Sequence, residues 1–569
     1  LNAPLILNVK HNPPVPRSGQ EVVVSTKLRG VEDFILGANL YWRVSTLDPG
    51  DFIEFTMQDQ GVNGDIKSGD GIFSALVPAQ DNETVIEFYI KSTAGDSVRR
   101  WPNIGESEEG PNALFQFVDE SFSGSQPVYR MVMTASEDRD FRFRNFNSSS
   151  DAQKNSTLIV RQGEDYDIRY QCGVRVRGAG SRTRNPRNNR LNIPRDNPLS
   201  GTTKINLNSQ YIYLQLLGSR LASLSGIEAA SARPVQLRYN GVNRANDNDN
   251  ERRYGSYLHV EAIDGQWADD HYPNDPGGNI YSKARPDVKW SIRSTEALGP
   301  DSNRYRSDGW SKGSNESLDD WSDLHRFMRV MNNTSSDEYF QGVSEVVDVE
   351  QWTRWFAFMT IVLSRETNLS NGTDDDYKLY SGLEDKRFKL IPHDFDTIFG
   401  LGDTDTDPDD SIFPAITNFG GQTMPQLNEF FNEPKVLRLY YENLEDLLNT
   451  VFSKDKFDSL VENSLNWLPE DSDVLSDVIS FMDDRRAYIL SQISGGFTAQ
   501  SSLSSSNSFA RTTDQGLTGL EGTFDAKLTT EIRVNGIKFG DTKALFNVGF
   551  TLEQPEQNYI VNEERDWKL

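Results

Sequence analysis

The stretch Lys389-Leu-Ile-Pro-His-Asp-Phe-Asp-Thr-Ile-Phe-Gly400 combines a short apolar strand with two aspartates on alternate residues, Asp394 and Asp396. The strand is predicted over residues 388–391, and Pro392 ends it. A carboxylate at the end of a buried strand costs free energy unless a positive group meets it. A divalent cation carrying phosphate oxygens is one such group. An Asx turn, in which both aspartates cap backbone N–H groups, is the alternative, and this stretch alone leaves both open.

Length and composition predict an acidic protein built from several folded units. The 569 residues exceed what one hydrophobic core holds, and 36% apolar with 11% aromatic residues suffice for several cores. The formal net charge of −27 opposes binding to nucleic acid and to anionic membranes. The longest apolar run, residues 355–363, is too short for a transmembrane helix. The sequence therefore predicts neither a nucleic-acid partner nor a transmembrane segment.

The sequence also favours an exported protein, extracellular or at the cell surface. An acidic composition rich in Asn and Thr suits salty or calcium-containing surroundings. The single cysteine, Cys172, excludes an internal disulfide framework, so stability must come from the cores and from bound ions. The numbering begins at Leu1 rather than at Met, so we expect any signal peptide to lie outside it.

Composition and hydrophobic pattern divide the chain into five parts. Alternating runs at residues 21–27, 38–44 and 84–91 predict an immunoglobulin-like or fibronectin-like β-sandwich. The expected order is a β-sandwich at 1–105, a linker with one strand at 106–127, an α+β region at 128–495, a Ser-rich linker at 496–519, and a second β module at 520–569 that can be incomplete.

Two acidic loops are candidate calcium sites. In the first, Asp59, Asp65 and Asp70 are spaced between glycines, so they can wrap a calcium ion or form successive tight turns. The second contains Asp403, Asp405 and Asp407, and it can be an open calcium loop or a merely repulsive acidic loop.

The central region begins strand-rich and ends helical. A basic glycine loop at 178–190 can hold phosphate oxygens through arginine forks and glycine N–H groups, or it can be a flexible solvated hairpin. Helices are predicted at 209–224, after Asp348 with Gln351 as a capping box, and through 426–493. Residues 264–316 are expected to form irregular loops.

This order of parts resembles the spore-coat protein H (CotH) kinase family over residues 128–495. The segments that carry the resemblance are Val174-Arg-Val-Arg-Gly178 with Ser181 and Pro186, Tyr254-Gly-Ser-Tyr-Leu-His-Val-Glu261-Ala-Ile-Asp264, Asn279-Ile-Tyr-Ser-Lys283, Tyr377-Lys-Leu-Tyr380 and Ile391-Pro-His-Asp394-Phe-Asp396. The resemblance implies a two-lobed, atypical protein-kinase-like domain that uses ATP with Mg or Mn, and an exported protein.

The resemblance also implies roles for single residues. Asp394 matches the metal-binding aspartate, with Asp396 and Asp376 as candidates to complete the site. The cofactor candidates are Arg177 and Arg187 for the phosphates and Glu261, in the segment joining the lobes, for adenine. Glu366 or Asp374 would accept the proton of the substrate hydroxyl.

The sequence departs from the family at two of these positions. Arg187 and Asn188 stand where lysines usually follow the proline, and arginine is not equivalent to lysine at a phosphate. The aspartate expected before the Tyr-x-Leu-Tyr strand is also not clearly matched. A kinase that is catalytically weak or inactive therefore stays open.

Three functions follow as alternatives. The first is an exported CotH-like kinase that transfers phosphate from ATP to a surface or matrix protein. The second is a kinase-fold scaffold without turnover, a surface adhesin or structural protein that self-associates through its β modules. The third is a carbohydrate-active enzyme in which Glu366 pairs with an aspartate, at a separation of about 5 Å or about 6.5–9.5 Å.

Overall fold

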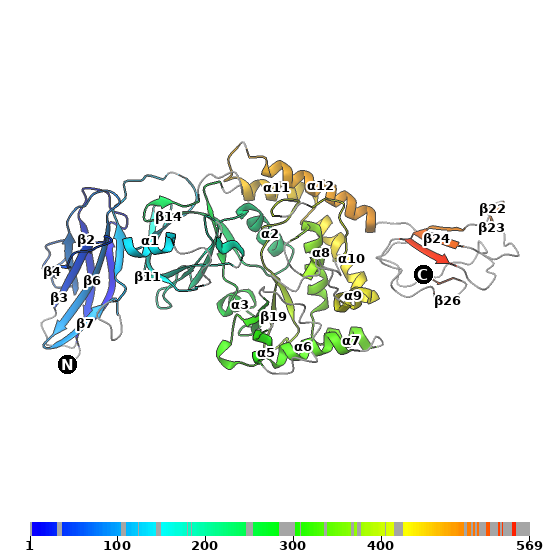
Figure 1. Ribbon diagram of the computed structural model, residues 1–569, viewed down its shortest axis with the longest axis horizontal. Coiled ribbons are helices and arrows are strands. Elements are labelled where there is room, and N and C mark those ends of the chain that lie inside the picture. Colours follow the sequence, from blue (N-terminus) through cyan, green and yellow to red (C-terminus); the bar gives the residue numbers. More distant parts are fainter. Residues whose placement is uncertain are drawn as a thin grey trace. The chain divides into compact units, whose positions relative to one another are not determined.

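The computed structural model describes most of the chain, in segments (Figure 1). The described residues are 3–30, 37–103, 110–122, 124–143, 150–178, 180–183, 185–245, 254–283, 302–307, 309–334, 338–365, 369–371, 377–403, 406–414, 425–470, 472–493 and seven short strands after 497. The chain is a multidomain, mixed α/β protein that divides into two compact units. Unit 1 holds Leu1–Ile212 and Ala232–Ala262, and unit 2 holds Tyr213–Ser231 and Ile263–Leu569.

The first part of unit 1 consists of two antiparallel sheets around one core. One sheet has the order β1 (Leu5–Asn12), β2 (Val22–Arg29), β5 (Ile72–Val77). The other has the order β4 (Ile53–Met57), β3 (Gly37–Val44), β6 (Val85–Ala94), β7 (Ser97–Trp101), with β8 (Ala113–Gln116) also paired to β6. Alternate residues of both sheets, such as Val24, Leu40 and Phe88, share one hydrophobic core.

These sheets confirm the three strands predicted from alternation, at 21–27, 38–44 and 84–91. They also show that the strand expected inside the predicted linker, β8, is fully buried and lies in the second sheet. The immunoglobulin-like or fibronectin-like assignment stays a prediction.

The second part of unit 1 is a β-barrel. Its strands follow the order β14 (Ala232–Tyr239), β16 (Tyr257–Glu261), β13 (Lys204–Asn208), β12 (Asn189–Asn192), β11 (Asp165–Val176), β10 (Lys154–Gln162), β9 (Val128–Val132), with β15 (Val242–Asn243) beside β14. A parallel pairing of β14 with β9 closes the ring. Apolar side chains such as Val174, Leu207 and Leu237 fill the interior, and Phe141 of helix α1 (Ala135–Phe143) packs against it.

The outside of the barrel contacts the core of the two sheets. Tyr170 of β11 belongs to that core, where its hydroxyl donates to His11 Nδ1 (2.6 Å), while His11 Nε2–H donates to Pro14 O (2.9 Å). His11 is 2% exposed and its ring stacks on Phe115. A charged imidazole would be unstable at this position, because burial removes it from the solvent that stabilises the charge.

Unit 1 is therefore expected to lose stability in mild acid. Burial lowers the pKa of His11 to about 4, against about 6.5 in the unfolded chain. Between these values only the unfolded state binds the proton, so the free energy of unfolding falls as pH falls from about 6.5 to 4, by about 3 kcal/mol in total. Thermal midpoints measured from pH 7.5 to 4.5 test this. The His11→Asn variant should be less stable at pH 7.5 yet show a smaller loss toward pH 4.5, and an unchanged slope would contradict the assignment.

Unit 2 combines a small sheet with a helical region. The sheet has the order β18 (Trp310–Lys312), β17 (Asn279–Lys283), β19 (Tyr377–Ser381), β20 (Lys389–Pro392), and all three pairings are antiparallel. The helices are α2 (Ile212–Leu224), α3 (Gly265–His271), α5 (Ser302–Ser307), α6 (Ser322–Asn333), α7 (Tyr339–Ser344), α8 (Val349–Val362), α9 (Pro425–Asn432), α10 (Pro434–Asn449), α11 (Lys454–Leu465) and α12 (Val474–Ile493). Helix α8 packs against α10 and α12 (Figure 1).

The predicted helices at 209–224, after Asp348 and through 426–493 are confirmed as α2, α8 and α9–α12. The irregular loops expected at 264–316 are wrong in part, because α3, β17, α5 and β18 lie there. Asp264 explains one of these, since its side chain accepts the N–H groups of Gln266 and Trp267 and so starts α3.

The capping box at α8 is half confirmed. Asp348 is the N-cap and accepts the Gln351 N–H (3.3 Å). The Gln351 side chain does not return to the cap, because it binds both backbone groups of Leu390 instead, at 2.7 and 2.9 Å. The helix start is thereby joined to β20, the edge strand that precedes Asp394.

Seven short strands are described after residue 497. These are β21 (Thr498–Ser501), β22 (Ser505–Ser506), β23 (Phe509–Ala510), β24 (Gly519–Thr523), β25 (Arg533–Val534), β26 (Ile537–Lys538) and β27 (Gly549–Glu553). Strand β24 pairs with β21 and β27. Among the described residues of the whole chain, none of the helices has the length and apolar character that crossing a membrane requires.

Candidate functional site

The two aspartates of the opening stretch lie in a tight turn at the end of β20. Pro392 is the last residue of the strand and pairs with Tyr377 of β19. Asp394 follows with φ at +56°, a left-handed conformation that aspartate tolerates better than most residues. Asp394 and Asp396 are both half-buried, whereas Phe395 between them is fully buried. Burial of the phenylalanine anchors the turn that carries the two carboxylates.

Helix α2 holds Phe395 in two ways. The Phe395 N–H donates to Gln215 Oε1 (2.9 Å), and Gln215 is itself bonded to Ser219 one turn along the helix (3.2 Å). The ring lies directly over Gly218, where an added Cβ would meet its atoms at 2.3–2.6 Å. Only glycine permits this approach, so Gly218 sets the depth to which the turn is buried.

The chain after Asp396 folds back beside the end of α8. Arg365 N–H donates to Thr397 O (3.2 Å) and Phe399 N–H to Val362 O (2.9 Å). Gly402, with φ at +116°, passes so close that a Cβ there would lie 2.4 Å from Asp396 O. The Asp394 turn is therefore held in place by α2, by the end of α8 and by this returning segment.

Four predicted site residues lie outside the described part of the chain. They are Glu366, Asp374, Asp376 and Asp405. Their roles as proton acceptor, metal ligand or calcium ligand stay predictions. The nearest described neighbours are Arg365, which donates to Thr397 O, and Tyr377, which opens β19.

The basic glycine loop and Glu261 belong to unit 1. Arg177 Nη1 donates to Asn208 Oδ1 (2.6 Å), and its N–H pairs with Asn188 O (2.9 Å). Arg187 is half-buried, and its carbonyl accepts the Tyr257 hydroxyl (3.3 Å). Glu261 ends β16, opposite Ile205 of β13. Arg177 and Arg187 thus lie in the connection between β11 and β12 of the barrel. Glu261 is on β16, two strands away from β12.

The described part of the basic loop is bonded rather than free. Arg182 donates to Gly178 O (2.8 Å) and to Ser150 O (3.1 Å) and pairs with Asp151. Asn188 accepts from Ser209 N–H (2.8 Å). The described residues of the loop are thus hydrogen-bonded within the protein, while both interpretations of the loop, phosphate binding and a flexible solvated hairpin, stay predictions.

The three carboxylates of the first acidic loop lie close together. Asp59, Asp65 and Asp70 each place one oxygen within 4.8 Å of the others. Backbone N–H groups also bind them, three to Asp59, two to Asp65 and one to Asp70. Both sequence interpretations, tight turns and a calcium site, therefore fit the geometry, and calcium binding stays a prediction.

The second acidic loop is held by arginines. Arg485 of α12, with no exposed surface, donates to Pro408 O (2.9 Å), Asp410 O and Ser411 O (3.4 Å). Burial, above all, lowers the pKa of Arg485 to about 10, so it remains charged at neutral pH. The Asp410 side chain pairs with Arg365 (2.7 Å). Asp403 and Asp407 are exposed, and whether the loop binds calcium stays a prediction.

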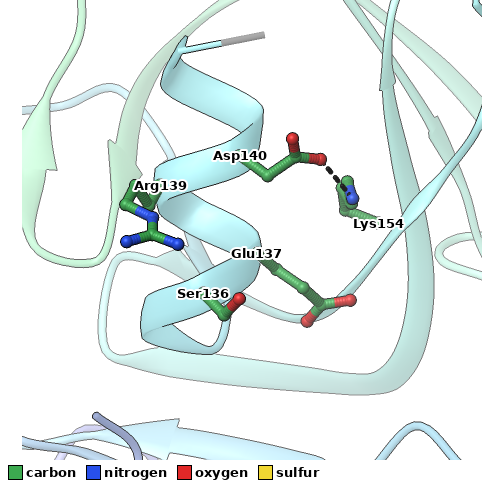
Figure 2. Close-up of a pocket in the computed structure, with 5 residues that line it drawn as sticks. All are labelled: Ser136, Glu137, Arg139, Asp140 and Lys154. Atoms are coloured by element: carbon green, nitrogen blue, oxygen red, sulfur yellow. Dashed lines mark ion pairs between the residues drawn. The ribbon is translucent and has the colours of Figure 1, made fainter. Parts of the chain in front are cut away.

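A pocket of about 570 Å³ opens beside α1 in unit 1 (Figure 2). Its lining residues are Ser136, Glu137, Arg139, Asp140 and Lys154. Lys154 pairs with Asp140, and Glu137 accepts from Asn155 N–H (3.0 Å) and from the Thr134 hydroxyl (3.1 Å). None of the predicted site residues lines this pocket, so we assign it no ligand.

Sequence reasoning missed the residues that support the Asp394 turn. Gln215 and Gly218 appeared only as members of an apolar helix, although a glycine in the middle of such a helix is a signal of close packing. Arg365 and Arg485 gave no local signal, because their partners lie far away in sequence.

The donor chemistry at the turn fits a divalent metal. Two carboxylates on alternate residues supply the oxygen ligands that Mg and Mn use. In unit 1, arginine donors near a glycine loop supply the groups that bind phosphate oxygens. Binding of a metal ion or of ATP stays a prediction.

Comparison with known proteins identifies the family. The family model described as CotH kinase protein matches residues 174–468, more than half of the chain, and the protein belongs to this family. The matched region includes the basic loop, Glu261 and the Asp394 turn.

Inner spore coat protein H of Bacillus subtilis (strain 168) is one relative. It is 23% identical over 302 residues, which are 52% of this chain and 76% of that protein. Among solved structures, a cycloalternan-forming enzyme from Listeria monocytogenes, in complex with a pentasaccharide substrate, matches at 9% identity and a TM-score of 0.15. That match spans 35% of this chain and only 19% of the enzyme, and it carries no argument about fold or function.

Proposed function

We propose that this CotH-family protein is an exported atypical kinase that transfers phosphate from ATP to a hydroxyl of a surface or matrix protein. The observation that carries the proposal is the Asp394-Phe395-Asp396 turn, whose phenylalanine is fixed by Gln215 and Gly218 while both aspartates stay half-exposed. Asp394 also has a positive φ beside the buried Phe395, and sparsely populated backbone conformations often occur at functional sites.

In this proposal each group has a stated task. Asp394 and Asp396 hold Mg or Mn, and Arg177 and Arg187 hold phosphate oxygens. The metal, when bound, neutralises charge on the transferring phosphate. The backbone near Glu261 meets adenine, as the family resemblance implies. Glu366 or Asp374 accepts the proton of the acceptor hydroxyl.

The order of the elements, the spore-coat relative and the acidic composition also support the proposal. The order of the described elements, with barrel strands, a helix, the strand that ends at Glu261 and then a helical region, supports the two-lobed kinase-like domain that the family resemblance implies. The relative is by its name an inner spore coat protein, and the acidic composition suits an exported protein. The terminal β modules would bind the matrix or further copies of the chain, and structural calcium at Asp59, Asp65 and Asp70 would be detected as a chelator-sensitive melting temperature.

Calorimetry of ATP binding with Mg or Mn tests the proposal. We expect metal-dependent binding by the wild type and a loss of at least about 100-fold for Asp394→Ala, since a metal site that loses one of its few carboxylates loses most of its affinity. Asp409→Ala is the matched control, because this exposed carboxylate of the same unit should leave binding unchanged.

Binding that needs metal and depends on Asp394 would support the kinase and justify a search for its acceptor. Absence of binding by the wild type with either metal would reject the kinase and leave the scaffold as the function of the fold.

A further inference from the structure

Arg365 connects the Asp394 turn to the second acidic loop. Its backbone N–H donates to Thr397 O (3.2 Å), the residue directly after Asp396. Its guanidinium Nη2 donates to Asp410 Oδ2 (2.7 Å), with 20% of the arginine side chain and 36% of the aspartate side chain exposed. One residue therefore ties the backbone of the candidate metal turn to a carboxylate thirteen positions further along the chain.

The position of Asp410 is fixed independently of Arg365. Its carbonyl accepts from buried Arg485, which also holds Pro408 O (2.9 Å). The Tyr440 hydroxyl donates to Ile412 O in the same segment and accepts from the Thr360 hydroxyl of α8 (2.9 Å). The backbone that carries Asp410 is thereby attached to α12, α10 and α8, so the carboxylate is placed before Arg365 binds it.

In phosphorylation-regulated kinases the segment after the metal aspartate is ordered when an added phosphate pairs with arginine. In this chain an aspartate of the same segment already supplies the negative charge. A carboxylate is a permanent anion at neutral pH, so this pairing needs no modifying enzyme. The arginine it binds precedes Glu366 directly and touches the backbone beside Asp396.

We propose that Asp410 is a positioning residue that holds Arg365, and through it the Asp396–Thr397 backbone, in the metal-binding geometry without any phosphorylation. This proposal rests on the proposed kinase function, because it concerns how the metal site of that kinase is held in its binding geometry before the metal and the nucleotide bind. Asp410 touches neither metal nor nucleotide and acts only through Arg365.

The test compares Asp410→Asn, Asp410→Glu and the control Asp409→Asn in the full-length protein. We expect Asp410→Asn to weaken binding of ATP with Mg by about 10-fold, since a partly buried charged hydrogen bond becomes a neutral one. Asp410→Glu should restore most of the affinity, and Asp409→Asn should behave as the wild type. Because the removed contact also holds the segment, residues 397–411 should be cut several-fold faster by a protease in Asp410→Asn without nucleotide.

Two further arms separate a positioning role from a general loss of stability. Arg365→Gln should weaken binding as much as Asp410→Asn, and the double variant should be no worse than either single one. Treatment of the wild type with a phosphatase should leave its affinity unchanged.

The outcomes divide clearly. Equal affinity of Asp410→Asn and wild type, additive losses in the double variant, or weaker binding after phosphatase treatment would each overturn the positioning role while the kinase proposal stands. A wild type that binds no nucleotide with either metal would overturn the kinase proposal and this inference with it.

Discussion

Replacing Arg485 with methionine is expected to lower the free energy of unfolding of unit 2 by about 3–5 kcal/mol. The side chain is completely buried in α12 and binds four backbone carbonyls, those of Thr360, Pro408, Asp410 and Ser411. Methionine fills a similar volume without donating a hydrogen bond. The carbonyls would stay buried and unpaired, at about 1–3 kcal/mol for each one that water cannot reach.

The contact with Thr360 O makes the loss of stability in Arg485→Met larger than the loss expected when a surface arginine is replaced. It lies in the last turn of α8, where backbone carbonyls lack partners within the helix. Arg485 binds it through both Nε (3.2 Å) and Nη2 (2.9 Å), and a cation at a helix C-terminus is favourable to the helix dipole. Arg485 therefore caps the C-terminal end of α8 and binds the second acidic loop through the same guanidinium group.

Scanning calorimetry measures the effect. The transition of unit 2 should move down by on the order of 10 °C in Arg485→Met. Arg438→Met is the control, because that arginine is half-exposed on α10 and pairs with Glu442 one turn away, and its loss should cost less than about 0.5 kcal/mol. If the two variants lose similar amounts of stability, the four carbonyls find other donors and the assigned role of Arg485 is wrong.

The local signals in the sequence were sufficient for several strands, for α2, α8 and α9–α12, and for the strand before the Asp394 turn. Alternation identified β3 and β6, and Asp348 marked the start of α8, because these patterns depend on neighbours a few residues away. The apolar run before Pro392 predicted a short strand, and the structure has β20 there. The turn that follows leaves both aspartates half-exposed.

Features that depend on distant partners were not predictable in this way. The barrel closes by pairing Leu237 of β14 with Tyr129 of β9, more than one hundred residues apart, and parallel pairing has no turn signal between the strands. Gln351 fits a capping box by spacing, yet its amide binds Leu390, because the backbone of an edge strand offers both a donor and an acceptor. The sequence showed Asp410 only as one member of an acidic run, and its arginine partner became visible only in three dimensions.

Replacing Gly218 with alanine is expected to destabilise the protein and to weaken ATP binding with Mg by at least about 10-fold. In the middle of a helix this substitution normally adds about 0.5–1 kcal/mol of stability, because glycine is the more flexible residue. Here the added Cβ would lie 2.3 Å from Cγ of Phe395, so we expect a net loss of about 1–3 kcal/mol from overpacking. The sign of the stability change therefore separates close packing from helix propensity.

The ring of Phe395 can relieve the clash only by moving outward, and its own backbone N–H is bonded to Gln215 on the same helix. Moving it would shift Asp394 and Asp396, which flank it in sequence, and so reduce metal-dependent binding. A second substitution, Phe395→Leu, should restore part of both stability and affinity in the Gly218→Ala background, because the smaller side chain leaves room for the new methyl group. Ser223→Ala, on the exposed side of α2, is the control and should change neither quantity. Full ATP affinity in Gly218→Ala would mean that the aspartates do not depend on the depth of Phe395, and the turn could not be the element that prepares the metal site.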